Sequence, residues 1–202
     1  MSMNKPQIGS LIQFGGYNWR VLDVQGDRAL IITEDVLDKK RKYHEQFDEV
    51  TWETCDLRRY LNGDFLSKLD SSRILTTPIK NDSNLWYGTK GGNDTQDKIF
   101  LLSLEEVDYY FGNSGDYSSM KRKRYDISKF SPDNNGQYLS NAHDSSRKAT
   151  NGKGEACWWW LRSPGDYCNF AAFVYEDGDF NVSGIYVDHD NVGVRPALWL
   201  KL

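Results

Sequence analysis

Two apolar blocks near the end of the chain constrain its fold more than any other feature of the sequence. The first block, residues 157–165, reads CWWWLRSPG, and the second, residues 193–198, reads GVRPAL. Tryptophan side chains bury large areas, so the blocks need a packed core around them. The 27 residues between the blocks are dense in Asp, Asn, Tyr, Phe and Gly. Because functional residues often lie on segments that a scaffold positions, we expect the blocks to frame a functional surface.

The composition of the whole chain favours a single domain without general affinity for nucleic acid. Its 202 residues are 39% hydrophobic, which is enough to build one core. The 25 basic and 29 acidic residues give a net charge of −4, whereas nucleic-acid binders depend on cationic side chains that neutralise phosphates. The basic run at residues 121–124 (KRKR) is interpreted as a solvated loop, with anion contact as the alternative.

The N-terminal residues contain no apolar segment typical of a signal peptide, and no run approaches the ~20 apolar residues of a membrane span. Cys55, Cys157 and Cys168 are odd in number and lack framework spacing, which favours reduced thiols. We therefore expect cytoplasmic synthesis, with a phage particle or a cell surface reached after lysis as further destinations.

Periodicity near the N-terminus predicts a meander followed by two helices. Residues 11–14, 17–24 and 28–33 are strand-like and are separated by glycine-containing turns. An apolar stripe predicts a helix over residues 54–61 that stops at Asn62 and Gly63, with a short helix over 65–69 after it. The sequence SLEE at 103–106 is a capping box that opens a helix reaching about Phe111.

The last quarter of the chain returns to strand patterns. We expect strands over residues 158–161, 170–175, 180–187 and 194–200, with a hairpin turn at 176–179. Residues 112–156 are polar and weakly periodic, which predicts a long loop insertion. The whole chain, residues 1–202, is therefore predicted to be one α+β domain.

Within the two blocks, most residues have a structural interpretation. Trp158, Trp160 and Leu161 are predicted to lie in the core. Arg162 and Arg195 are predicted to pair with buried carboxylates or backbone carbonyls, with direct ligand contact as the alternative.

These blocks resemble the C-terminal signature of the family called domain of unknown function 6273. Residues 14–23 (FGGYNWRVLD) are similar to the opening of that family, and residues 50–62 are similar to its helix. The family is thought to be related to the C-type-lectin-like fold of formylglycine-generating enzymes and of retroelement-diversified ligand-binding proteins. The resemblance therefore implies a small twisted antiparallel sheet, two main helices, long irregular loops, and pairing of the first and last strands.

The tract between the blocks, residues 166–191, is the candidate ligand-binding surface. Tyrosine offers rigid amphipathic area there, and small polar residues offer adaptable hydrogen bonds. The predicted surface consists of Asp166, Tyr167, Asn169, Phe170, Phe173, Tyr175, Asp177, Asp179, Phe180, Asn181, Ser183, Tyr186, Asp188, His189, Asp190 and Asn191.

The composition of this tract also fits a known mechanism of diversification. Residues 165–193 contain no Lys, Arg, Gln, Met or Trp, and Glu176 is their only Glu. Mutating the adenines of an Asn codon can yield Asp, Tyr, His, Ser, Phe, Cys or Gly, but not Lys, Glu, Gln, Met or Trp. Diversity-generating retroelements vary their target proteins in this way, and targets of known fold resemble C-type lectins. The alternative is that strand-and-turn segments favour the same residues without diversification.

An oxidase of the formylglycine-generating type is the main rival, because that family uses a cysteine pair near the corresponding end of its chain. Cys157 and Cys168 depart from its pattern in spacing and surroundings, and Cys157 is interpreted as a small core residue.

A calcium-dependent carbohydrate-binding lectin is the second rival. Oxygen ligands are abundant at Asp177, Asp179, Asp188, Asp190 and Asn191, but the triplets typical of calcium-dependent sugar binders are absent. We therefore predict a non-catalytic binding protein without cofactor or metal. Its expected partner is a protein or glycan on a cell surface, and an oligomeric form is compatible with the sequence.

Overall fold

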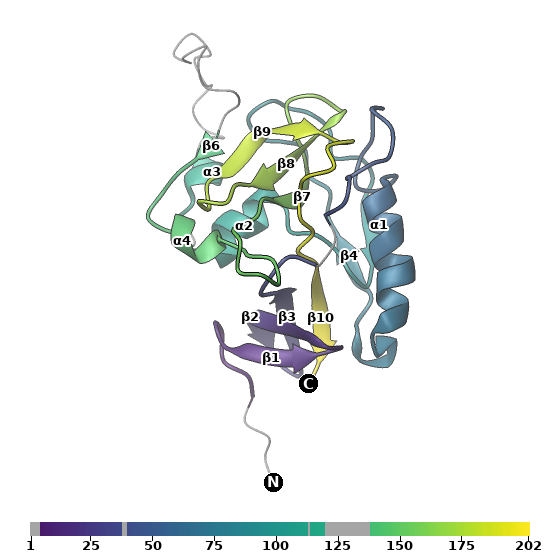
Figure 1. Ribbon diagram of the computed structural model, residues 1–202, viewed down its shortest axis with the longest axis vertical. Helices are drawn as coiled ribbons and strands as arrows, with labels where there is room; N and C mark the ends of the chain where they lie inside the picture. The colour runs from purple at the N-terminus through teal and green to yellow at the C-terminus, as the bar shows by residue number, and fades with distance from the viewer. Residues whose placement is uncertain (1–4, 38–39, 113, 120–137) are drawn as a thin grey trace.

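The computed structural model describes residues 5–37, 40–112, 114–119 and 138–202 (Figure 1). The chain is mixed α and β, with small antiparallel sheets and a few short helices. Figure 1 shows one sheet at the lower end of the molecule and a second sheet at the upper end, with helices beside the second. The basic run at 121–124 and much of the predicted loop lie outside the described residues.

The first sheet contains the predicted N-terminal meander. Strands β1 (Leu11–Phe14), β2 (Tyr17–Gln25) and β3 (Arg28–Thr33) pair antiparallel in sequence order. Gly15 and Gly16 both have positive φ, 57° and 83°, which is the backbone that a two-residue hairpin of right-handed twist requires. Local turn chemistry therefore fixes this part of the fold.

The last strand, β10 (Ala197–Lys201), completes the first sheet by pairing antiparallel with β3. The expected pairing of the first and last strands is wrong, because β10 pairs with β3 while β1 lies at the opposite edge of the sheet. The predicted strand over 194–200 begins later, at Ala197. Before that point the backbone bonds elsewhere, because the amide of Leu37 donates to the carbonyl of Val194 at 2.9 Å.

The second sheet has the order β6-β9-β8-β7. It is formed by β6 (Tyr138–Leu139), β7 (Trp159–Pro164), β8 (Phe170–Val174) and β9 (Phe180–Tyr186). The predicted hairpin turn is confirmed, since the amide of Tyr175 donates to the carbonyl of Asp179 at 2.8 Å. A two-stranded sheet, β4 (Thr77–Ile79) with β5 (Thr95–Asp97), was not predicted.

Helix α1 (Asp56–Tyr60) does not stop at Asn62 and Gly63, as the sequence predicted. It continues through a π turn (Leu61–Phe65) and a 3-10 turn (Leu66–Lys68), and Figure 1 shows the result as one long helical column. Tertiary bonds override the breaker signal here. The Asn62 side chain donates to the carbonyl of Ile99 at 2.8 Å and accepts from the amide of Lys98 at 2.9 Å.

Helix α2 (Leu104–Tyr110) begins at the predicted capping box, formed by Ser103 and Glu106, and ends at Phe111. The predicted loop over 112–156 also contains β6 and the short helices α3 (Asp116–Ser119) and α4 (Asp144–Arg147). A further 3-10 turn covers Ser71–Arg73. In the described part of the chain, no helix is long and apolar enough to cross a membrane.

The second sheet has two distinct faces, which follow from its register. Trp159 pairs with Val174, which pairs with Phe180, so these three side chains share one face, here called the helix face. Helical segments cover this face. The ring centroids of Trp159 and Phe111, which ends α2, lie 6.3 Å apart. The guanidinium of Arg147 in α4 lies 4.9 Å from the centroid of the Phe180 ring. Trp160 pairs with Phe173, and Phe173 pairs with Asn181, on the opposite side, here called the open face.

Candidate functional site

A cavity of about 610 Å³ lies directly on the open face of the second sheet. This cavity, here called the aromatic pocket, is lined by Trp158, Asp166, Phe170, Phe173, Tyr175, Asn181, Ser183, Gly184, Ile185 and Tyr186. All but Trp158 belong to the second sheet or to the tract between the two apolar blocks.

Aromatic rings form one wall of the pocket. Trp158 stacks on Phe173 with ring centroids 5.2 Å apart, and it meets Tyr175 edge-on at 5.0 Å. Phe173 and Tyr175 also contact each other, at 4.7 Å. Offset and edge-on pairs of this kind fix ring orientation, so the wall is preorganised.

At the other end of the pocket the rings reach the surface. Phe170 and Tyr186 lie 4.7 Å apart, Phe47 packs edge-on against Tyr186 at 5.1 Å, and Tyr167 lies 5.8 Å from Phe170. Tyr167, Tyr186 and Phe47 are 65%, 50% and 49% exposed, and we call these three the aromatic rim. Sequence reasoning missed Phe47, because it lies more than 100 residues before the tract and only folding brings it to Tyr186.

An irregularity in β9 hollows the sheet at the pocket. The pairs Ala171–Ile185 and Phe173–Asn181 leave residues 182–184 of β9 opposite a single residue of β8. The Asn181 side-chain oxygen holds this bulge by accepting from the Ser183 hydroxyl and from the amide of Gly184, both at 2.8 Å. Gly184 has a φ of 77°, and a Cβ there would lie 2.5 Å from the carbonyl oxygen of Ala171, so only glycine fits.

The pocket is braced from outside the tract by Asn84, a buried residue that sequence reasoning missed. Its side-chain amide donates to the carbonyls of Pro164 at 2.9 Å, Val182 at 2.8 Å and Gly165 at 3.3 Å. Asn84 is thus the link between the end of β7 and the bulge of β9. No local pattern marks it, because its partners are at least 80 residues away along the chain.

Asp166 is the one formally charged residue among the described residues that line the pocket. Its Oδ1 atom is buried and has no hydrogen-bond partner in the described part of the chain. Burial raises the pKa of the Asp166 carboxyl. Hydrogen bonds from the backbone amides of Asp166 and Tyr167 lower this pKa by a smaller amount. The hydroxyl of Thr89 fixes the backbone here by donating to the carbonyl of Asp166 at 2.8 Å.

The predicted ligand-binding surface needs correction at two aromatic residues, which are buried. Phe173 is 1% exposed and Phe180 is 0% exposed. Strand alternation turns Phe180 to the helix face beneath Arg147. Phe173 does face the pocket, but the rings of Trp158, Trp160 and Tyr175 cover it. Asn181 and Ser183 are also buried, and they line the pocket floor.

The first apolar block needs one correction as well. Trp160 and Leu161 are buried, as predicted, but Trp158 is only partly buried and lines the aromatic pocket. Trp159, which the sequence did not single out, is the fully buried ring of the helix face. Adjacent tryptophans therefore point to opposite faces of one sheet.

Asp177 and Asp179 lie in the β8–β9 turn and do not line the aromatic pocket. The Asp177 side chain accepts from the amide of Asp179 at 3.1 Å. Burial and a shared hydrogen bond with Asp144 raise the pKa of Asp179 to about 6. This carboxyl pair joins the turn to α4, where Arg147 donates to the carbonyl of Gly178 at 2.7 Å.

The remaining tract residues lie in loops beside the pocket and are partly or fully exposed. They are Asn169, Asp188, His189, Asp190 and Asn191. The His189 ring stacks against the Trp158 ring at 6.3 Å, and Lys40 Nζ donates to Asn191 Oδ1 at 2.6 Å. The structure thus brings part of the predicted set together in a pocket and distributes the rest around it.

The cysteines are all free thiols. Cys157 is buried, as predicted, and burial raises the pKa of its thiol. Such a thiol is poorly suited to nucleophilic chemistry, which requires a thiolate. Across the described ranges, no group of three or more His, Cys, Asp or Glu side chains is arranged to hold a metal ion.

The two arginines of the blocks have the predicted structural partners. Arg162 Nη2 binds Glu106 Oε1 at 2.9 Å, and its Nη1 donates to the carbonyl of Leu101 at 2.8 Å. Arg195 Nε donates to the carbonyl of Thr33 at 2.7 Å. Both side chains therefore fasten the second sheet and its flanking segments to the rest of the core.

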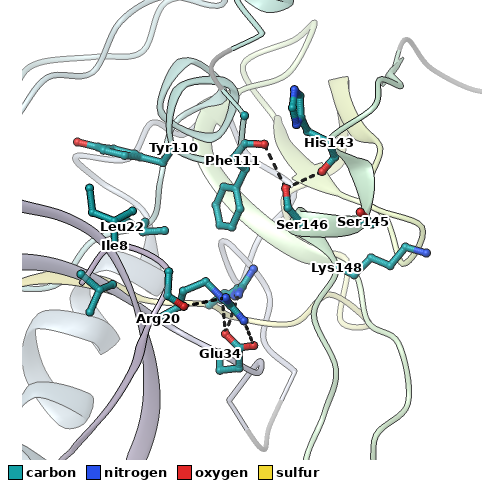
Figure 2. A pocket seen from close by; sticks show the side chains of 14 residues that line it. Ile8, Arg20, Leu22, Glu34, Tyr110, Phe111, His143, Ser145, Ser146 and Lys148 are labelled. Carbon is teal, nitrogen blue, oxygen red and sulfur yellow. Dashed lines mark hydrogen bonds and ion pairs between the residues drawn. The ribbon is translucent and has the colours of Figure 1, made fainter. Parts of the chain in front are cut away.

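A second cavity, of about 430 Å³, lies between the first sheet, α2 and α4 (Figure 2). Figure 2 shows Arg20 and Glu34 paired there, with Ser146 and His143 across the cavity. The Ser146 hydroxyl donates to the backbone carbonyls of His143 at 2.6 Å and Phe111 at 3.1 Å. Because the hydroxyl is engaged by the carbonyl of His143, the two residues do not form a nucleophile–base pair of the hydrolase type.

A family model described as a domain of unknown function (DUF6273) matches residues 26–202 of the chain. The comparisons with curated proteins and with solved structures give no match.

Proposed function

The chain belongs to the family described as a domain of unknown function (DUF6273), and we propose that it is a non-catalytic ligand-binding protein. The observation that carries this proposal is the aromatic pocket with its exposed rim. The pocket is concave, preorganised by ring contacts and furnished with a few polar groups, which are the features of ligand sites. An exposed aromatic patch is likewise typical of interaction surfaces.

The proposal includes a C-type-lectin-like fold. Two features support this assignment: the C-terminal strand β10 returns to the N-terminal meander, and the second sheet lies at the far end with the site on it. In such an arrangement the first sheet holds the frame while the second sheet and its loops carry the ligand. The expected partner is a protein or glycan on a cell surface.

Diversification by a retroelement is part of the same proposal, with a narrower set of variable positions. A variable position must accept many side chains, which suits exposed residues such as Tyr167 and Tyr186. Phe180 is buried beneath Arg147, and buried Asn181 accepts from the backbone amide of Gly184, so both belong to the constant frame. A near-copy of the coding segment beside a reverse-transcriptase gene, differing at adenines in the exposed codons, would support this part.

Chemistry at the cysteines is the less favoured alternative. Cys157 is buried with its sulfur 3.4 Å from the carbonyl oxygen of Glu155, and it does not line the aromatic pocket. The binding proposal therefore accounts for the aromatic pocket, which an oxidase centred on Cys157 would leave without a role.

Binding to a glycan array and to a peptide array tests the proposal directly. We expect the wild-type protein to bind a limited set of ligands, and Trp158→Ala and Tyr186→Ala to weaken that binding about tenfold or more, as for interface hot spots. Tyr109→Ala is the matched control, because Tyr109 is an exposed tyrosine on α2. Equal binding by wild type and both pocket variants would contradict the proposal.

A further inference from the structure

The charge of the aromatic pocket indicates which ligands it can take, if the pocket is the binding site proposed above. Asp166 is the one formally charged residue among the described lining residues, and its Oδ1 lacks a hydrogen-bond partner there. A buried carboxylate oxygen without a donor costs free energy, and that cost is recovered when a donor arrives. A cationic donor would recover the most, because hydrogen bonds between charged groups are the stronger kind.

The rings around Asp166 favour the same kind of ligand. Trp158, Phe170, Tyr175 and Tyr186 line the pocket together with Phe173. Aromatic faces attract ammonium and guanidinium groups through their quadrupoles, and tryptophan does so most strongly. No lysine, arginine or histidine is among the described lining residues, so the pocket contains no cation of its own.

We infer that the aromatic pocket receives an arginine or lysine side chain of a polypeptide partner. The basic group would lie against the rings and donate to the carboxylate of Asp166. The exposed rim of Phe47, Tyr167 and Tyr186 continues from the pocket and offers contact area for the residues that flank the basic side chain. The net charge of −4 adds a general attraction for a basic partner.

A glycan is the competing occupant, because sugar rings also stack on aromatic side chains. The two occupants differ in how they use Asp166. A sugar hydroxyl can bond to an amide oxygen as well as to a carboxylate, whereas a cation loses its counter-charge when the carboxylate is replaced. The substitution Asp166→Asn therefore separates the two.

The test uses pairs of peptides that differ in charge and little in shape. Ac-Ala-Ala-Arg-Ala-Ala-NH2 is compared with the same peptide carrying citrulline, and the lysine peptide with its acetyl-lysine form. We expect the charged member of at least one pair to bind wild-type protein about tenfold more tightly by titration calorimetry or tryptophan fluorescence. Asp166→Asn should remove that preference, whereas Asp177→Asn, which alters an exposed carboxylate outside the pocket lining, should keep it.

Two results would overturn the inference. Equal affinity for the charged and neutral peptides of both pairs would do so on wild-type protein alone, without any variant that has to fold. Retention of the charge preference by folded Asp166→Asn would do so as well. If peptides fail but array glycans bind and depend on Trp158, the cationic ligand is excluded while the proposed function stands. If no ligand depends on Trp158 or Tyr186, the proposed function fails too.

Discussion

The helix face and the open face of the second sheet are made from the same strands, yet they differ in how they treat side chains. On the helix face, Trp159 and Phe180 are fully buried and Arg147 covers the Phe180 ring. On the open face, Trp160 and Phe173 are also buried, but Trp158 and Tyr175 are only partly buried and line a cavity. Strand alternation thus places Trp159 in the core and its neighbour Trp158 in the pocket, although both are tryptophans.

The faces also differ in their polar groups. Arg147 on the helix side donates to the carbonyl of Gly178 at 2.7 Å and to Asn141 Oδ1 at 3.1 Å. On the open side, Asp166 keeps an oxygen without a partner in the described part of the chain. A closed face satisfies its polar groups internally, whereas a binding face can leave one for a ligand.

The largest expected effect tests whether the helix face is structural. Phe180→Ala should lower the free energy of unfolding by about 3–5 kcal/mol, because it leaves a cavity under Arg147. Tyr186→Ala on the open face should cost only about 0.5 kcal/mol, since the ring is half exposed. Urea unfolding followed by circular dichroism measures both. Similar losses in the two variants would remove the distinction between the faces.

An intermediate effect is expected at Asn84, which braces the open face. Asn84→Ala leaves the carbonyls of Pro164, Gly165 and Val182 without its amide, and should cost about 1–3 kcal/mol. Ligand binding should weaken too, because Asp166 follows this anchored segment. Asn93→Ala is the control, since Asn93 is exposed and bonds to Glu53. An Asn84→Ala protein as stable as the Asn93→Ala protein would show that the brace is unimportant.

The smallest effect concerns the pH dependence of stability at the turn between β8 and β9. The pKa of Asp179 is raised to about 6, so the folded state holds this proton more tightly than the unfolded chain does. The resulting stabilisation is fully present below about pH 4, the unfolded pKa, and is lost as the pH rises through about 6. The substitution Asp179→Asn should remove this loss of stability at rising pH.

Thermal unfolding of the wild type and of Asp179→Asn at pH 4, 5, 6 and 7 measures the difference. Relative to the wild type, we expect the free energy of unfolding of the variant to rise by about 1 kcal/mol between pH 4 and pH 7. This is less than the full pKa difference gives, because the carboxyl pair is partly solvated. Parallel curves for the two proteins would show that Asp179 titrates normally.

Much of the fold could be predicted because its signals are local. The glycine turn at Gly15 and Gly16, the capping box at Ser103 and the hairpin turn before Asp179 all act within a few residues. The stop predicted at Asn62 was wrong for the opposite reason. The side chain that would break a helix instead bonds to residues 98 and 99, which lie far along the chain.

The sequence by itself determined the meander, the capped helix, the C-terminal hairpin and the frame of two apolar blocks, because turns, caps and alternation are decided by near neighbours. It also marked the tract that contributes most of the aromatic pocket. Only the tertiary structure decided which tract residues face the pocket, since a bulge in β9 and the long-range bonds of Asn84 set that side-chain orientation. The same holds for Phe47 and Tyr186, which meet because the packed core brings distant segments together.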